Sequence, residues 1–534
     1  MFAIIGMIAK LVGALYRIPL TNAMGAEGIG LYQLVFPLYT VLLTATSGGL
    51  PAAIAKVTAG FNAVGDERRS RETLTVSLAV VSAVTSAAAV GLVLLRNRIA
   101  FIQGNALAAL SYLGIAPSLV LVGVISCFRG YYQGSHNMLP SALSQLVEQV
   151  VKLFAGLALC RVLLPYGIQY AVLGAVSGVT LSEVAALIGL LATYAFTRRS
   201  HAARTVVHLD ALPQNAFSAE VAAELAPPAE PQPRITRGSL IRRVYRIALP
   251  VTLGSLVIPI TQVIDSVLVI NILTASTGTS LATSLFGLLN GPVNSLVNMP
   301  VVVTMAVSVA LLPKVSAATA VGRDYRRTVE TALKYSLVIA LPTAGALGVF
   351  ARPILSLLYA RSIRPELLDV GTTLLRLGSV TVVYMSVVQV ATAVLQGSDR
   401  PRIPAVNLVV GATVKVLTTV LLLRYIGIFG AVTASALCYG VTAALDAVAL
   451  MKRAPIRPSF YRTVLAPLLS SAVALALGYG TYLAFHGRSG LYALIVAAVV
   501  TVAVYIVGLL LTRCFTRDEL SVLPLIGNGK TKSK

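Results

Sequence analysis

Apolar stretches of about 20 residues recur along the whole chain, and no other feature limits its possible folds as strongly. Residues 73–95 and 489–512 contain no charged side chain at all. A helix of a soluble protein would instead carry charged residues on one face at every turn. Since 57% of the 534 residues are hydrophobic and 11% are charged, we expect an all-α membrane protein.

The apolar stretches predict about fourteen transmembrane helices. We place them near residues 2–24, 29–57, 73–95, 106–128, 140–163, 169–196, 247–271, 282–312, 328–350, 368–395, 404–423, 428–450, 463–484 and 489–512.

Basic residues in the connecting segments predict the orientation. If both termini lie in the cytoplasm, the inner segments hold 28 Lys and Arg residues and the outer segments hold 8. The positive-inside rule therefore predicts a multi-pass protein with its N- and C-termini inside. The net charge of +23 then reflects basic loops beside anionic lipid, and no nucleic-acid partner is expected.

The cysteines and histidines do not form a recognisable metal or disulfide pattern. Cys127, Cys160, Cys438 and Cys514 lack CxxC pairing, and the four histidines lack ligand spacing. We expect no metal site and no cofactor, although transport could be coupled to H⁺, Na⁺ or the membrane potential.

Two sequence echoes predict an internal repeat. Gln-Gly-Ser occurs at 133–135 and again at 396–398, and each copy is followed by a proline and, nineteen residues after the glutamine, by a lysine. The copies are 263 residues apart. A weaker echo pairs Ala-Lys-Val at 55–57 with Pro-Lys-Val at 313–315.

An offset of six helices keeps both copies the same way up, which predicts parallel lobes related by an axis along the membrane normal. Transporters built this way hold their cargo between the lobes near mid-bilayer. The predicted parts are an N-terminal lobe (1–196), a cytoplasmic linker (197–246), a C-terminal lobe (247–450), two extra helices (451–512) and a cytoplasmic tail (513–534).

Charged residues inside the spans are expensive unless they face a cavity or a partner. The cations are Lys10, Arg17, Lys152, Lys334, Arg376 and Lys415, and the acids are Glu148, Glu183, Asp265 and Asp446. The candidates for a cationic cavity are Arg17, Lys10, Lys152, Arg376 and Lys415. Arg17 has no acid three or four residues away, whereas Lys152 could instead pair with Glu148, and Lys10 could extend to the interface.

Two further features concern the same space. Asp265 could bind a coupling proton or cation, or could pair with one of the cations. Asn290, Asn294 and Asn298 are four residues apart and share one helix face, beside Gly291 and Pro292, which loosen the backbone. Such an amide stripe either joins helices or lines an aqueous cavity.

The chain resembles the stage V sporulation protein B / polysaccharide biosynthesis protein group of the multidrug/oligosaccharidyl-lipid/polysaccharide exporter superfamily, which is related to MurJ-type lipid II flippases. The matching strings are GMIAKLVGALYRIPLTNAMGAEGIGLYQLVFPLY at the start, GGLPAAIAK at 48–56 and FRGYYQGSHNMLPSALSQLVEQ at 128–149. The resemblance implies a V-shaped, MATE/MurJ-like bundle of two six-helix lobes plus two C-terminal helices. In such flippases arginines of the first helix contribute to a cationic cavity, and the matching stretch here runs from Lys10 to Arg17.

The resemblance implies a flippase that moves an undecaprenyl-pyrophosphate-linked oligosaccharide by alternating access. We expect lipid II, for wall or spore-cortex peptidoglycan, with membrane lipid and wall or cortex synthesis enzymes as further partners. The alternative is a MATE-like drug or cation antiporter, but six intramembrane cations against four acids favour an anionic cargo. An enzyme is not expected, because the outer loops offer only Glu27, Glu366 and Asp369 for acid–base or metal chemistry.

Overall fold

The structure is a computed structural model that describes residues 12–13, 15–135, 137–210, 236–453, 459–485 and 490–515, with the backbone alone for 197–210. Within this part of the chain every regular element is a helix. Lys10, residues 2–11 and 14 of the predicted first span and most of the C-terminal tail fall outside the described residues.

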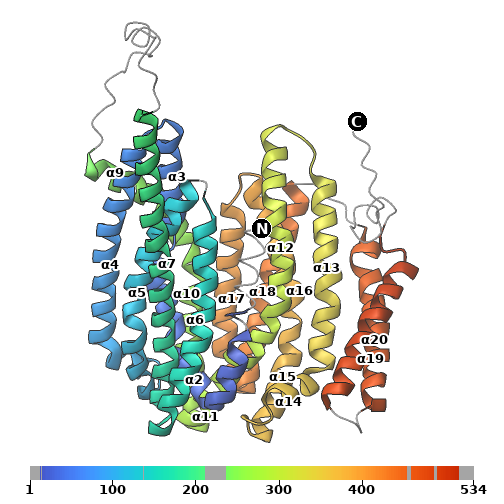
Figure 1. Cartoon of the computed structure of the whole chain (residues 1–534). Coiled ribbons are helices and arrows are strands. Elements are labelled where there is room, and N and C mark those ends of the chain that lie inside the picture. The colour runs from blue at the N-terminus through green and yellow to red at the C-terminus, as the bar shows by residue number, and fades with distance from the viewer. Residues whose placement is uncertain are drawn as a thin grey trace.

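The first half of the chain forms a bundle of long helices, drawn in blue to green in Figure 1. They are α2 (Arg17–Ser47), α3 (Leu50–Ala63), α4 (Glu67–Ile102), α5 (Ser111–Gly134), α6 (Leu139–Leu163) and α7 (Ile168–Asp210).

The second half forms another bundle, with a separate helix pair beside it (Figure 1). The helices of the second half of the chain are α9 (Arg237–Ser255), α10 (Val257–Thr277), α11 (Thr279–Leu288), α12 (Asn294–Ala320), α13 (Arg326–Val349), α14 (Ala351–Tyr359), α15 (Pro365–Ser379), α16 (Thr381–Gly397), α17 (Arg402–Ile426), α18 (Ile428–Arg453), α19 (Ala466–Phe485) and α20 (Gly490–Leu511).

Glycines set the breaks in the first helical segment. Gly25 interrupts α2 with φ 69° and ψ −171°, at the boundary predicted between the first two spans. The Gly48–Gly49 pair separates α2 from α3, and the Gly49 N–H donates to Thr252 Oγ1 at 3.1 Å. A Cβ on Gly49 would lie 2.3 Å from the Ala248 carbonyl oxygen, so only glycine allows α9 this close.

The all-α membrane fold class is confirmed, whereas the count of fourteen spans is not. Within the described residues, 12 helical segments are long and apolar enough to cross a membrane. Arg17–Ala63 is a single segment among these, and it merges parts of two predicted spans. The predicted span 140–163 corresponds to α6, which is 25 residues long, carries Glu148, Lys152 and Arg161, and is not among the twelve.

The segment 197–246, which we expected to be a linker, is helical at both ends. The helix α7 continues to Asp210, and α9 begins at Arg237. Leu240, Val244 and Ala248 of α9 are buried in a cluster with residues of α3 and α4. The apolar face of α9 therefore packs on the first half of the chain.

In each half of the chain, the Gln-Gly-Ser segment of one echo packs against the Lys-Val segment of the other. A Cβ on Gly134 of α5 would lie 2.5 Å from the Ala55 carbonyl oxygen of α3. In the second half, a Cβ on Gly397 of α16 would lie 3.1 Å from the Leu312 carbonyl oxygen of α12, and 3.0 Å from Cβ of Val315. The echoed segments are thus the two sides of one close helix crossing, which the repeat preserves.

The last two helices pack on each other and against α13. The hydroxyl of Tyr505 on α20 donates to the Val338 carbonyl of α13 at 2.7 Å, and Ala466 and Leu509 lie in the same apolar cluster. Figure 1 shows this pair at the side of the second lobe, away from the first. It is therefore an addition to the two-lobed body.

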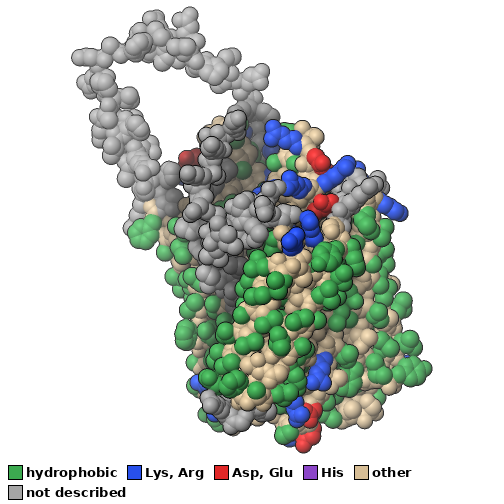
Figure 2. Space-filling view, turned by 90° about the vertical axis from the view of Figure 1, so that its right-hand side faces the viewer, with side chains coloured by type: hydrophobic (Ala, Val, Ile, Leu, Met, Phe, Trp, Pro, Cys, Tyr) green, Lys and Arg blue, Asp and Glu red, His purple; other side chains and the backbone are tan. Residues whose placement is uncertain are grey.

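The two ends of the molecule differ in charge. We call them the α9 end and the α14 end, after the helices that lie there in Figure 1. Figure 2 shows one face, on which most Lys and Arg side chains gather at the α9 end, while the sides are largely hydrophobic. This distribution is the one expected of a protein that crosses a bilayer with its α9 end toward anionic lipid.

Candidate functional site

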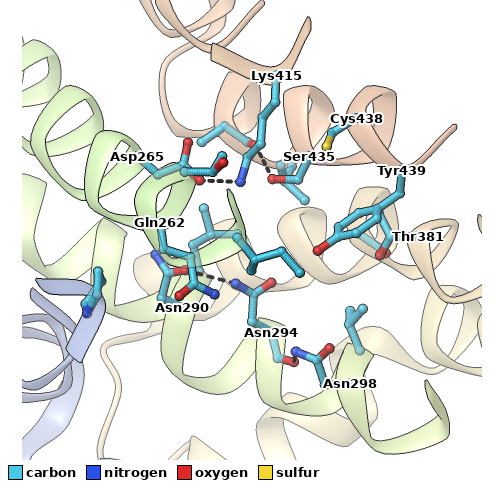
Figure 3. A pocket seen from close by; sticks show the side chains of 18 of the residues that line it. Gln262, Asp265, Asn290, Asn294, Asn298, Thr381, Lys415, Ser435, Cys438 and Tyr439 are labelled. Carbon is cyan, nitrogen blue, oxygen red and sulfur yellow. Dashed lines mark hydrogen bonds and ion pairs between the residues drawn. The ribbon is translucent and has the colours of Figure 1, made fainter. Parts of the chain in front are cut away.

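A polar cavity lies where α2 of the first half meets the helices of the second half. Its volume is about 460 Å³, within the range of small-molecule sites. Figure 3 shows its polar side chains converging from several helices. They are Arg17, Gln33 and Thr40 from α2; Thr261, Gln262 and Asp265 from α10; Asn290, Asn294 and Asn298 from α11–α12; Thr381 from α16; Lys415 from α17; and Ser435, Cys438 and Tyr439 from α18.

Asp265 and Lys415 form an ion pair across the cavity wall. Nζ of Lys415 donates to Oδ2 of Asp265, and both side chains are mostly buried, at 15% and 17% exposure for Lys415 and Asp265. Figure 3 shows the two side chains pointing toward each other from α17 and α10. The sequence left two roles open for Asp265, which were to bind a coupling cation or to pair with a basic residue. The structure shows the ion pair.

Arg17 lines the same cavity but has a neutral partner. Its Nη1 lies 3.3 Å from the Ser295 hydroxyl oxygen of α12, so the contact joins the two halves. Among the residues that the structure describes, Arg17 has no ion-pair partner. A guanidinium in a membrane interior is costly without an anion, so this side chain is available for an anionic ligand.

The three asparagines form a hydrogen-bonded chain along the cavity wall (Figure 3). Nδ2 of Asn294 donates to Oδ1 of Asn290 at 2.9 Å, and Nδ2 of Asn298 donates to the Asn294 carbonyl at 2.7 Å. The backbone beside them is a π-helical turn at Leu289–Val293, which contains Pro292. Proline lacks the N–H needed for a regular helical ladder, which accounts for the distortion.

The π-helical turn also brings α2 into contact with the cavity wall. The Gln33 side-chain amide donates to the Asn290 carbonyl. A Cβ on Gly291 would lie 2.8 Å from Cγ1 of Ile29, so glycine permits the close approach. Gly291, which loosens the backbone at the start of α12, thus also allows this turn to pack against α2 of the first half.

Sequence reasoning missed several polar residues of the cavity. Gln33, Gln262, Thr381, Ser435 and Tyr439 line it, yet each is a neutral residue within an apolar helix. The spacing offers a weak signal: Gln262 lies three residues before Asp265, and Ser435 lies four before Tyr439, so each pair shares a helix face.

Three candidates for the cationic site lie elsewhere or outside the described residues. Arg376 is exposed on α15 and does not line the cavity. Its neighbours Leu374 and Leu375 occupy the buried face of this helix, so Arg376 points to the other face. Lys152 is half-buried on α6, within electrostatic range of Glu148, Glu183 and Arg17, but is not part of the cavity wall. Lys10 falls outside the described residues.

The local pair proposed for Lys152 does not form. Glu148 pairs instead with Arg129 of α5, with Nη2 and Oε2 3.0 Å apart. Ser144 Oγ accepts from Arg129 Nε at 3.0 Å, which fixes the guanidinium. A better-placed cation on a neighbouring helix therefore takes the carboxylate.

Contacts that join the two halves gather near the α14 end. Nδ2 of Asn105 donates to Thr283 Oγ1 at 2.8 Å, and Nδ2 of Asn271 donates to the Ile102 carbonyl at 2.9 Å. Beside them α2 and α11 cross closely, since a Cβ on Gly30 would lie 2.1 Å from the Thr283 carbonyl oxygen. These contacts close the space between the halves on that side of the cavity.

Comparison with known proteins agrees with the expected grouping. The sequence pattern of the polysaccharide biosynthesis protein family matches residues 1–318, and the MatE pattern matches residues 250–421. Stage V sporulation protein B of Bacillus subtilis (strain 168) is 26% identical over 549 residues, covering 98% of this chain and 96% of the relative. Lipid II flippase MurJ of the same organism is 24% identical over 489 residues, covering 88% and 85%.

Solved structures share the fold. A lipid II flippase MurJ in an inward closed conformation matches with a TM-score of 0.70 at 12% identity, covering 96% of this chain and 98% of that one. An inward-facing multidrug resistance MATE transporter of the MOP superfamily matches with a TM-score of 0.61 at 15% identity, covering 83% and 94%. The expected MATE/MurJ-like architecture is confirmed, and the chain is a multi-pass membrane protein of that fold.

Proposed function

Because the chain belongs to the polysaccharide biosynthesis protein family, we propose that it is a flippase for an undecaprenyl-pyrophosphate-linked oligosaccharide. Alternating access between the two lobes moves the cargo from the cytoplasmic to the outer leaflet of the bacterial cytoplasmic membrane. Lipid II is the cargo we propose first, because MurJ and stage V sporulation protein B are among the relatives.

The observation that carries this proposal is Arg17 in a polar cavity at the junction of the halves, where its partner is the neutral Ser295 and no described residue forms an ion pair with it. A guanidinium holds two phosphate oxygens at once, and a pyrophosphate supplies them. Lys415 is a second cation of the same wall, paired with Asp265, and the asparagine stripe supplies neutral hydrogen-bonding groups suited to sugar hydroxyls. No covalent chemistry is required, since the site only has to bind and release.

The second candidate is a MATE-like drug or cation antiporter. The MatE match at residues 250–421 and the acidic Asp265 in the cavity favour it. Against it, Lys415 already neutralises Asp265, so the cavity keeps the charge of Arg17. A cationic drug would meet that charge, whereas an anionic head group is attracted by it.

We propose that both termini face the cytoplasm, which places the α9 end inside. The support is the bias of 28 basic residues against 8 in the connecting segments. Wall or spore-cortex synthesis enzymes remain proposed partners, by analogy with the names of the relatives.

The test is lipid II transport in bacterial cells depleted of their own flippase. Cells express the wild type or Arg17→Ala, and outer-leaflet lipid II is measured by biotin accessibility. The wild type should restore outer-leaflet lipid II. Arg17→Ala should lower it at least about tenfold, because a hydrogen bond to a charged group contributes about 1.5–3 kcal/mol.

Arg376→Ala is the matched control, since it removes an arginine that does not line the cavity. It should transport like the wild type at equal membrane abundance. Normal transport by Arg17→Ala would remove Arg17 from the site. If the inserted wild type moves no lipid II but lowers the accumulation of a cationic dye, the antiporter function replaces the flippase.

A further inference from the structure

The Asp265–Lys415 ion pair is incomplete on its acidic side. Oδ2 of Asp265 accepts a hydrogen bond from the Lys415 ammonium, whereas Oδ1 is buried and has no hydrogen-bond partner within the part of the chain that the structure describes. Both residues line the cavity that contains Arg17. A buried carboxylate oxygen without a donor is costly, so the carboxylate is poised to take up a further positive group.

Among the described residues, Lys415 is the one positive charge that acts on Asp265. From α18 the titratable neighbours are Cys438 and Tyr439, and Ser435 also lines the wall. Gln262 lies on the same helix, and Arg17 is the charged residue that α2 gives to the cavity, where it contacts Ser295. Asp265 thus depends on one lysine for its charge balance.

That lysine is also one of the two cations that an anionic cargo meets. If phosphate oxygens take Lys415, the Asp265 carboxylate remains in the cavity wall beside a new anion and without a partner. Two unbalanced negative groups in a low-dielectric space repel each other strongly. A positive charge must then accompany the cargo into the site.

We propose that Lys415 exchanges partners during transport: Asp265 holds it in the empty cavity, the cargo's phosphate oxygens hold it in the loaded one, and Asp265 then binds a monovalent cation, either H⁺ or Na⁺. This inference rests on the proposed function. One cation is taken up for each anion bound and no bond of the cargo is broken. Cargo and cation therefore raise each other's affinity by the same factor.

A second mostly buried ion pair, between Arg129 and Glu148, cannot serve in this way. Arg129 and Glu148 lie on α5 and α6 and do not line the cavity, so a bound cargo does not reach them. The position of the Asp265–Lys415 pair in the wall, rather than its burial alone, makes it exchangeable.

The experiment measures binding of undecaprenyl pyrophosphate, and separately of inorganic pyrophosphate, to the full-length protein in lipid nanodiscs. Affinity is measured from pH 6 to 8 and, at fixed pH, in NaCl or choline chloride. One linked cation raises the wild-type affinity by up to about tenfold for each unit by which the pH falls, or for each tenfold increase in Na⁺. The arm that responds identifies the cation.

Asp265→Asn is the decisive variant, because the probe's own phosphates titrate in the same range. It should bind the probe at least as tightly as the wild type and lose the extra dependence on pH or Na⁺. Lys415→Gln should bind more weakly and lose the dependence as well. Asp369→Asn, an exposed acid paired with Arg352 outside the cavity, should keep the wild-type dependence.

The outcomes separate this inference from the proposed function. Tight binding with the same cation dependence in the wild type and Asp265→Asn would overturn the exchange and leave the flippase proposal standing. Failure of the folded wild type to bind either probe would overturn both. Thermal unfolding of each variant in the same nanodiscs establishes that it is folded. If a single variant is unstable, the double variant Asp265→Asn/Lys415→Gln takes its place, and it should also lack the dependence of binding on pH or Na⁺.

Discussion

Arg129 and Glu148 form a mostly buried ion pair between α5 and α6, with side-chain exposures of 16% and 17%. Desolvating two charges costs nearly as much as their attraction returns, so such a pair adds little net stability. Removing one partner is different, because the other charge stays buried without compensation.

We therefore predict that Glu148→Gln lowers the stability of the folded protein by about 3–5 kcal/mol. The measurement is the fraction that remains monodisperse after heating in detergent. Arg129→Met/Glu148→Leu should recover much of the loss, since no charge is then left unpaired. A double variant less stable than Glu148→Gln would contradict the account.

At the scale of helices, close crossings at glycines hold each half together. Gly134 brings α5 against α3, and Gly397 brings α16 against α12. The former contact is tighter, because the nearest backbone oxygen would lie 2.5 Å from an added Cβ, against 3.1 Å at Gly397. The repeat therefore preserves the crossing but not its tightness.

Gly134→Ala should lower the stability by about 1–3 kcal/mol, since an added methyl group would overlap backbone atoms that cannot move freely. Gly397→Ala should cost less, because Val315 can shift by a few tenths of an ångström. Thermal unfolding of the purified variants measures the difference.

Gly189→Ala on α7 provides the control, since an added Cβ there meets nothing within 4 Å. Alanine favours a helix, so this variant should be as stable as the wild type or slightly more stable. Equal losses at all three positions would show that the crossings are not the cause.

At the scale of the whole molecule, the halves are joined near the α14 end through Asn105, Thr283, Gly30 and Asn271. Alternating access requires these contacts to separate when the cavity opens on that side. They are neutral hydrogen bonds and small-residue contacts, which break at a lower cost than a buried ion pair would.

A disulfide between Asn105→Cys and Thr283→Cys should therefore stop transport. The Asn105 amide and the Thr283 hydroxyl face each other, with Nδ2 and Oγ1 2.8 Å apart. Two cysteines here therefore face each other as well, and a disulfide that forms once the backbone adjusts to the required geometry would lock the α14 end. Lipid II flipping should fall to background after oxidation and return on reduction.

Each single cysteine variant should be unaffected by the oxidant, since the four native cysteines are buried. Full transport by the cross-linked protein would mean that the halves do not separate at this end.

The sequence alone predicted the all-α membrane class, most span positions, the charge bias and the shared face of Asn290, Asn294 and Asn298. Those features depend on local periodicity and composition, which neighbouring residues in the chain carry. The break at Gly25 was predictable for the same reason, since it depends on one residue's backbone.

Only the tertiary structure decided which charged residues meet. Lys415 and Asp265 are 150 residues apart, and Arg17 and Ser295 are 278 apart, so no local spacing relates them. The same holds for Glu148, which pairs with Arg129 instead of Lys152, and for Arg376, which faces away from the cavity. A sequence fixes what each helix face carries, whereas the packing of distant helices decides which faces enclose a common space.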